Sequence, residues 1–166
     1  MEIEEIMNML GCSDTQIQEQ GILCASQVSE LDVFFQPLGE FNNSRIWTNC
    51  AKVLANKTDS ELEHYIDKMF EWLQDINWFG ARIIRDRLKK FSGKMLSTKF
   101  IATVEETIEK AKKCDEYSLM WLDYLSGLLD NEELKAELPM EMLAILQKHY
   151  DKWTWWYDDE NDRIVL

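Results

Sequence analysis

The chain has 166 residues and a formal net charge of −13, from 18 basic and 31 acidic side chains. Hydrophobic residues make up 46% and charged residues 30%, a globular composition that argues against disorder. Nucleic-acid phosphates repel a chain this acidic, so the charge favours a basic protein partner, or serves solubility alone. A chain of this length can bury one hydrophobic core without disulfides or bound metals, and we expect a single domain over residues 1–166.

The four cysteines lie far apart and form no C-x-x-C pair. Zinc requires closely spaced ligands, so we expect no metal site, and we also expect no cofactor. Scattered cysteines fit a reducing compartment, so we expect a cytoplasmic location. The N-terminal sequence MEIEEIMNML is acidic where a signal peptide is basic. No apolar run approaches the ~18 residues of a spanning helix, so we expect no attachment to a membrane.

Apolar residues at helical spacing predict three helices in the first part of the chain. The first covers residues 3–10 and ends at a glycine. Ser13 or Asp14 can cap the second, whose apolar side extends over residues 17–28. A short third helix is predicted over residues 31–38, before a break at glycine and asparagine residues.

The next two helices have the clearest pattern. One apolar stripe extends over residues 46–54, and the segment Thr58-Asp59-Ser60-Glu61 is typical of a capping box. From Leu62 to Leu73 the apolar face is unbroken over three turns, which predicts one continuous helix.

Four more helices complete the predicted body. Their predicted ranges are 77–91, 97–111, 115–129 and 139–150. Asn77 and Asp115 are the expected caps, and Pro139 suits the first position of the last helix. The aromatic and acidic tail, residues 151–166, could form a small β-hairpin.

A repeat of small residues accompanies these helices. The pairs are Cys24-Ala25, Cys50-Ala51 and Gly80-Ala81, about 26 to 30 residues apart. Small residues let helix backbones approach closely, and a helix rich in large apolar residues follows each pair. The fold class predicted is therefore all-α, a right-handed α-α superhelix of roughly four HEAT-like helix pairs. An irregular helical bundle is the alternative.

Motifs of catalysis or phosphate binding are missing from the sequence. His64 and His149 fit structural positions on helices, and the paired carboxylates of Glu71 and Asp75 fit a solvated face better than acid–base chemistry. The Trp residues could form an aromatic cage, although core packing is the more usual role at this spacing. We therefore expect no catalytic residues and no enzyme activity.

Charge is distributed unevenly along the chain. Residues 1–44 contain eight acidic and no basic residues, whereas segment 82–99 contains seven basic residues against Asp86 alone. A negative surface steers a basic partner, and we predict a set of partner-binding carboxylates. This set is Glu19, Glu30, Asp32, Glu40, Glu71, Asp75, Asp158, Asp159 and Glu160. Segment 82–99 could bind nucleic acid instead, or could neutralise neighbouring acidic helices.

Two segments carry a resemblance to a known family. WTNCAK at 47–52 and EWLQDINWFGA at 71–81 resemble small bacterial proteins of uncharacterised function with a W-L-Q-D-x-N-W-P-G-A signature. The likeness extends from about Arg45 to Tyr150. It implies a HEAT-like fold and a role as an immunity partner of a secreted toxin. The chain departs from the signature at Phe79, where the family has proline, and no catalytic role is carried over.

These observations lead to one functional hypothesis and three alternatives. The hypothesis is a non-catalytic, immunity-type inhibitor that binds and occludes a basic protein, such as a toxin domain. The alternatives are a HEAT-like nucleic-acid-binding protein, an enzyme using segment 82–99, and a scaffold or regulatory adaptor.

Overall fold

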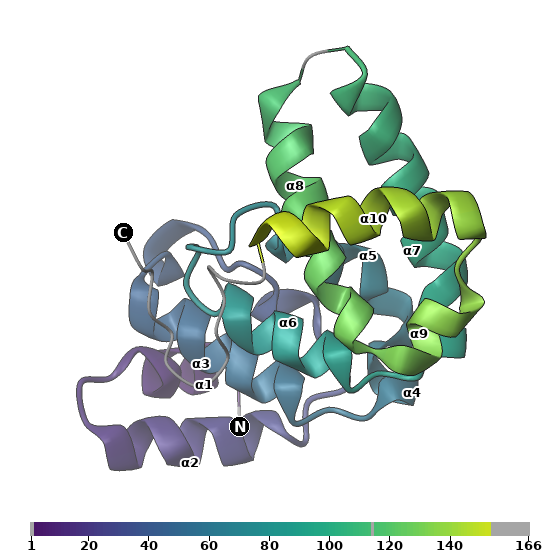
Figure 1. Cartoon of the computed structure of the whole chain (residues 1–166). Helices are drawn as coiled ribbons and strands as arrows, with labels where there is room; N and C mark the ends of the chain where they lie inside the picture. Colours follow the sequence, from purple (N-terminus) through teal and green to yellow (C-terminus); the bar gives the residue numbers. More distant parts are fainter. Residues whose placement is uncertain (1, 114, 154–166) are drawn as a thin grey trace. The chain divides into compact units, whose positions relative to one another are not determined.

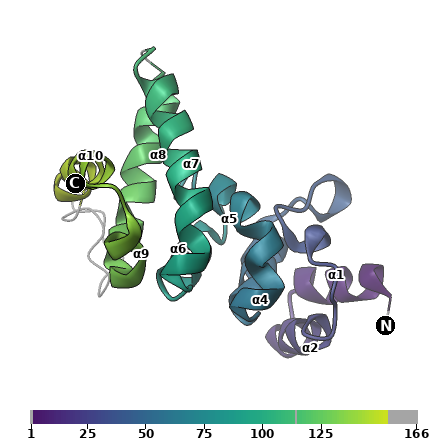
Figure 2. The same cartoon turned by 90° about the vertical axis from the view of Figure 1, so that its right-hand side faces the viewer.

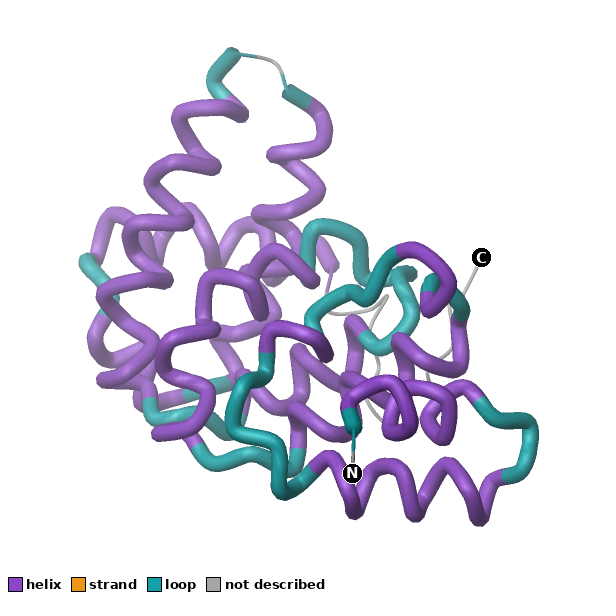
Figure 3. Tube along the Cα trace, turned by 180° about the vertical axis from the view of Figure 1, so that it is seen from behind, coloured by secondary structure: helices purple, strands orange, loops and turns teal. Residues whose placement is uncertain are grey.

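A computed structural model describes residues 2–113 and 115–153, and all regular structure in these ranges is helical (Figure 3). The all-α prediction is confirmed. The chain divides into two compact units, Met1–Arg87 and Leu88–Leu166, which we call the N-unit and the C-unit. The single-domain expectation stays a prediction, and the predicted hairpin in the tail lies outside the described residues.

Helices α1 (Ile3–Gly11) and α2 (Thr15–Ala25) pack against each other at the start of the N-unit (Figure 1). Asp14 caps α2 by accepting a hydrogen bond from the backbone N–H of Gln16, as predicted. Gly21 makes the close approach possible, because a Cβ there would lie 2.9 Å from the Cβ of Met9. The predicted apolar side of α2 is partly wrong, since Ile17 is exposed and the helix ends at Ala25.

The short helix predicted over residues 31–38 does not form. Two 3₁₀ turns, η1 (Asp32–Phe34) and η2 (Gly39–Phe41), replace it. Gln36 has a φ of 46° and precedes Pro37, a combination that an α-helix cannot accommodate. Phe34 still reaches the core, whereas Leu38 is 72% exposed.

Helix α3 (Ser44–Ala55) packs on α1 and α2 and forms the centre of the N-unit. The Asn43 side chain caps it by accepting a hydrogen bond from the N–H of Ile46. Its buried Asn49 donates to the carbonyl of Leu10, which ties α3 to the C-terminal end of α1. The predicted stripe over residues 46–54 is confirmed, with Cys50 and Leu54 fully buried.

The capping box at Thr58 and Glu61 is confirmed, but the continuous helix expected after it is interrupted. The segment is divided into α4 (Asp59–Leu62), η3 (Glu63–Tyr65) and α5 (Ile66–Trp72). The predicted apolar residues are nevertheless buried, apart from the half-buried Tyr65, because a single 3₁₀ turn displaces the stripe only slightly.

Lys57 is a buried cation that sequence patterns did not indicate. Its Nζ lies 2.8 Å from the carbonyl oxygens of Ser26 and Val28 and 3.2 Å from the carboxylate of Glu61. The ammonium group thus satisfies carbonyls that follow α2, where a helix leaves its last acceptors unpaired.

Helix α6 (Ala81–Lys89) begins four residues after the predicted start at Asn77. The delay has a physical cause, because Gly80 has a φ of 81° and so cannot belong to a right-handed helix. The boundary between the two units falls within α6.

The C-unit contains α7 (Gly93–Ala111), α8 (Glu116–Ser126), the 3₁₀ turn η4 (Gly127–Asp130), α9 (Glu132–Glu137) and α10 (Met140–Trp153). Helices α7 and α8 lie side by side, and α8 also packs on α10 (Figure 2).

The predicted helices of the C-unit are confirmed with shifted ends. Helix α7 begins at Gly93 instead of near Ser97, and the short helix α9 was not predicted. The buried Asn131 fixes α9 in place, because its side-chain amide donates to the carbonyls of Leu88 and Phe91 while its oxygen caps the helix. Within the described ranges, no helix has both the length and the apolar character needed to cross a membrane.

Candidate partner-binding surface

Four of the predicted partner-binding carboxylates are exposed side chains of the N-unit. Glu19 lies on α2, Glu30 precedes η1, Glu40 lies in η2 and Glu71 on α5. No ion pair joins any of these four to another of the described residues, so their charges remain open to a partner. The structure therefore leaves a set of uncompensated acids on the N-unit, which we call the free acids.

Two further predicted residues have partners inside the N-unit. Asp32 forms a salt bridge with Lys68, and this hydrogen bond, together with the lysine's charge, lowers the pKa of the carboxyl group from its ordinary value. Asp75 accepts a hydrogen bond of 2.8 Å from the N–H of Asn77, which shapes the turn after α5. Asp158, Asp159 and Glu160 lie outside the described residues.

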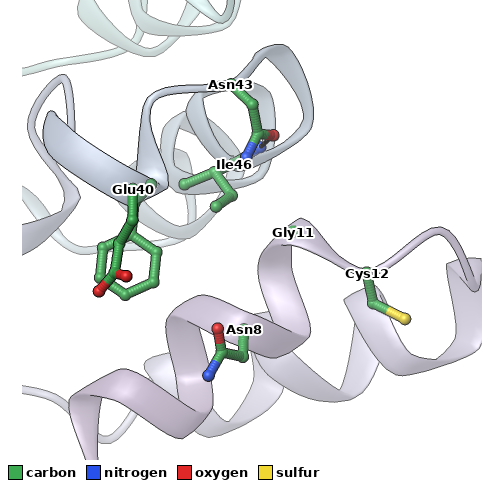
Figure 4. A pocket seen from close by; sticks show the side chains of 7 residues that line it. Asn8, Gly11, Cys12, Glu40, Asn43 and Ile46 are labelled. Carbon is green, nitrogen blue, oxygen red and sulfur yellow. Dashed lines mark hydrogen bonds between the residues drawn. The ribbon is translucent and has the colours of Figure 1, made fainter.

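An open pocket of about 310 Å³ lies beside one of the free acids (Figure 4). Its lining residues come from α1 and from the segment that runs from η2 into α3. They are Asn8, Gly11, Cys12, Glu40, Phe41, Asn43 and Ile46. Ile46 is buried and Phe41 is half-buried, so apolar surface lies next to the exposed carboxylate of Glu40.

Glu40 supplies the full negative charge of this pocket, which two helix ends also border. Gly11 and Cys12 are at the C-terminal end of α1, where the helix dipole carries partial negative charge. The side-chain oxygen of Asn43 caps α3 by accepting a hydrogen bond from the N–H of Ile46. The exposed side chain of Asn8 has no hydrogen bond within the described part of the chain. No basic residue lines the pocket.

The WLQD-x-NW segment, residues 72–78, has a structural explanation in the turn between α5 and α6. Trp72 is fully buried, and its indole N–H donates to the carbonyl of Phe79 at 3.0 Å. A Cβ on Gly80 would lie 2.6 Å from the Cβ of Ala51. The predicted close approach of small residues is thus observed at Ala51 and Gly80, between α3 and this turn.

Trp78 has a different environment from Trp72. It is 38% exposed and packs edge-on against Trp47, with ring centroids 6.4 Å apart. The neighbouring Phe79 is 56% exposed. The Nε1 of Trp47 donates to the carbonyl of Pro37, next to the exposed Leu38. These residues place large apolar side chains at the surface, as in many protein interfaces.

Three basic residues of segment 82–99, Arg85, Arg87 and Lys89, form ion pairs with acidic groups. In the N-unit, Arg85 forms a salt bridge of 3.0 Å with Asp86, and Arg87 binds Asp59 and the carbonyl of Lys57. In the C-unit, Lys89 forms a salt bridge of 2.7 Å with Asp130. Neutralisation of acidic groups, one of the two roles expected for this segment, is therefore observed at these three residues.

A buried carboxylate in the C-unit binds a histidine. Asp123 on α8 is 4% exposed, and its Oδ1 lies 2.6 Å from Nδ1 of His149 on α10. Lys152 lies 3.7 Å from the other oxygen. The pair links two helices that are 26 residues apart in sequence, which is why spacing did not reveal it. His64 is exposed on η3, as expected.

Metal ligation finds no support among the described residues, where no group of three or more His, Cys, Asp or Glu side chains converges. Cys50 is fully buried, and burial raises the pKa of its thiol to about 12. A thiol in that state is a small apolar side chain and not a nucleophile or ligand.

Comparison with known proteins gives one match. Residues 48–160 match a family described as a domain of unknown function (DUF5071). No curated protein and no solved structure matches the chain. The matched range covers well over half of the chain and includes the turn from Trp72 to Gly80. The chain therefore belongs to this family of domains of unknown function.

Proposed function

We propose that the chain is a non-catalytic protein-binding module of the immunity type, which binds and occludes a basic partner such as a toxin domain. The observation that carries the proposal is the set of free acids on the N-unit. Glu19, Glu30, Glu40 and Glu71 are exposed and form no ion pair within the described residues. A carboxylate that stabilises nothing in its own fold is available for a partner.

The energetics of such acids favour recognition over stability. An exposed ion pair within a protein contributes only about 0.2–1 kcal/mol. Across an interface, the same charges raise association rates from about 10⁵–10⁶ towards 10⁸–10⁹ M⁻¹s⁻¹ at low salt. An acid-rich surface with no basic residue in segment 1–44 therefore suits fast capture of a basic protein.

The exposed aromatic residues are a second observation that supports protein binding. Trp and other aromatic residues are enriched among the few positions that dominate binding energy. Trp78 and Phe79 are both exposed and belong to a turn that is tied to α5 by the hydrogen bond from the Trp72 indole to the Phe79 carbonyl. A rigid apolar anchor loses little conformational entropy when it is buried by a partner.

The pairing in segment 82–99 weakens the nucleic-acid and enzyme alternatives. Arg85, Arg87 and Lys89 already contact acidic groups, so binding phosphate there would require breaking ion pairs within the fold. Because the net charge is −13, a polyanion would also meet long-range repulsion.

For the fold, we propose that the helix pairs stack as a right-handed HEAT-like superhelix. The close approaches at Gly21 and at Gly80 support it, because both occur where small residues face another helix. An experimental structure tests this proposal, and an irregular arrangement of the helix pairs would refute it.

The functional test uses the proteins encoded beside this chain. Each is expressed alone and together with the chain, and we expect one toxic, basic product whose toxicity the chain suppresses by forming a stable complex. A complex that depends on DNA or RNA with a steep salt dependence would favour the nucleic-acid alternative instead.

Two variants with equal charge changes locate the surface. The N-unit triple variant is Glu19→Gln, Glu30→Gln and Glu71→Gln. The C-unit triple variant is Glu105→Gln, Glu137→Gln and Glu141→Gln, at exposed residues without an ion pair in the described ranges. Because none of the six stabilises the fold through an ion pair, both variants should fold normally. We expect only the N-unit triple variant to lose protection.

A further inference from the structure

The pocket beside Glu40 combines features that suit a cation with an apolar stem. Its volume of about 310 Å³ can accommodate a long side chain, and its wall includes buried Ile46 and half-buried Phe41. The carboxylate of Glu40 and the C-terminal end of α1 supply negative charge, while the Asn8 side chain adds an unused oxygen acceptor.

The residues that line this pocket offer it no cation. None of the lining residues is basic, and segment 1–44, which provides most of them, contains neither lysine nor arginine. Elsewhere in the N-unit the fold does pair its acids, as with Asp32 and Lys68 or Asp59 and Arg87. Glu40 differs from these acids because it lines a pocket and has no ion pair within residues 2–113 and 115–153.

We propose that this pocket binds an arginine side chain of the basic partner. The inference rests on the proposed function and names the group that the partner inserts. Arginine fits better than lysine for two reasons. Its planar guanidinium can donate to a carboxylate and an amide oxygen at once, and it stacks on aromatic rings such as that of Phe41. Its three-carbon stem can cover the apolar wall formed by Ile46.

An anion is the wrong ligand for the same site. The Asn43 side chain already accepts a hydrogen bond from the N–H of Ile46, so this donor at the N-terminus of α3 is occupied. Glu40 would repel a phosphate or carboxylate group directly. The negative charge of Glu40 therefore favours cations over anions, and the shape of the pocket then discriminates between different cations.

The test uses N-acetyl-L-arginine methylamide, followed by the backbone and side-chain amide signals of the isotope-labelled full chain. The matched control compound is the citrulline analogue, which keeps the shape and removes the charge. We expect arginine to shift the signals of Asn8, Gly11 and Asn43 with a millimolar dissociation constant. Citrulline should leave them unchanged, and the lysine analogue should bind several-fold more weakly.

Substitutions complete the experiment. Glu40→Gln should weaken arginine binding about five- to tenfold, because it removes a charge-assisted hydrogen bond. Glu105→Gln, an equal charge change at an exposed residue of the C-unit outside the pocket lining, should have no effect. Shifts that are equal for citrulline, lysine and arginine, or that survive Glu40→Gln, would overturn the proposal.

The outcome is separable from the proposed function. No partner is needed for the titration, so the pocket can be tested even if no toxin is found. Loss of partner binding in the N-unit triple variant, with no arginine response at Glu40, would support the general function and refute this pocket. An arginine response at the pocket, together with a failure to find any basic partner, would support the pocket and refute the proposed function.

Discussion

Gly80 provides the sharpest test of how the two small-residue positions fit together. Its φ of 81° lies in a region that L-residues rarely adopt, and a Cβ there would meet the Cβ of Ala51 at 2.6 Å and the carbonyl oxygen of Trp47 at 3.1 Å. Gly80→Ala therefore imposes two separate costs, one conformational and one steric.

The two costs can be estimated separately. Placing alanine in the left-handed region costs about 1–2 kcal/mol. The overpacking adds about 1–3 kcal/mol, because Ala51 lies in a helix interior and cannot easily move away. We expect Gly80→Ala to lower the free energy of unfolding by about 2–5 kcal/mol, the sum of the two costs. Gly39→Ala is the matched control, since Gly39 has a φ of 72° but no atom within 4 Å of its Cβ position, and it should carry the conformational cost alone, about 1–2 kcal/mol.

The assay is urea unfolding followed by circular dichroism, with Ala51→Gly as the second arm of a double-mutant cycle. Ala51→Gly alone costs about 1 kcal/mol through helix propensity. In its presence, Gly80→Ala should lose the steric cost due to Ala51, while it keeps the conformational cost and the close contact with the Trp47 carbonyl oxygen. We therefore expect a favourable coupling of about 0.5–3 kcal/mol. Equal costs for Gly80→Ala in both backgrounds, or no difference from Gly39→Ala, would refute the close approach.

Three further predictions concern caps and tryptophans. Hydrogen bonds from the Thr58 backbone and hydroxyl lower the pKa of Glu61 to about 2 from 4.5, so its stabilising contribution is complete above pH 4.5 and is lost as the pH falls towards 2. Thr58→Ala should flatten the stability–pH curve in that window, and an unchanged slope in acid denaturation would contradict this. Asn131→Ala should cost about 3 kcal/mol in urea unfolding, because it removes a helix cap and two buried hydrogen bonds; a cost below 1 kcal/mol would contradict the geometry. Trp72→Phe should cost about 2–3 kcal/mol, and Trp78→Phe, at a 38% exposed residue, less than about 1 kcal/mol; equal losses would show that the two environments are alike.

Local patterns predicted the parts of the fold that depend on neighbours in sequence. Local sequence alone reveals the capping box at Thr58 and Glu61 and the cap at Asp14, because each joins residues two or three positions apart. The apolar stripes were equally accessible. The 3₁₀ turn at η3 was not, because the same residues face inwards whether one turn has three or 3.6 residues.

The helix boundaries and the pocket beside Glu40 depended on contacts between residues far apart in the sequence, which local spacing does not encode. The start of α6 is set by the backbone of Gly80 and its distance to Ala51, 29 residues earlier in the chain. The pocket requires α1 to lie near Glu40, and the Asp123–His149 pair joins two separate helices. Charge counting nevertheless identified Glu40 as a candidate, while the pairing of Asp32 with Lys68 became visible only in three dimensions.

The most direct test of the central claim compares partner affinities of the two triple variants over a range of salt concentrations. If the free acids of the N-unit capture a basic partner, the N-unit triple variant should bind at least tenfold more weakly at low salt, mainly through slower association, and its salt dependence should be shallower. The C-unit triple variant should retain the affinity of the unmodified chain. Equal affinities for both variants, at all salt concentrations, would contradict the account.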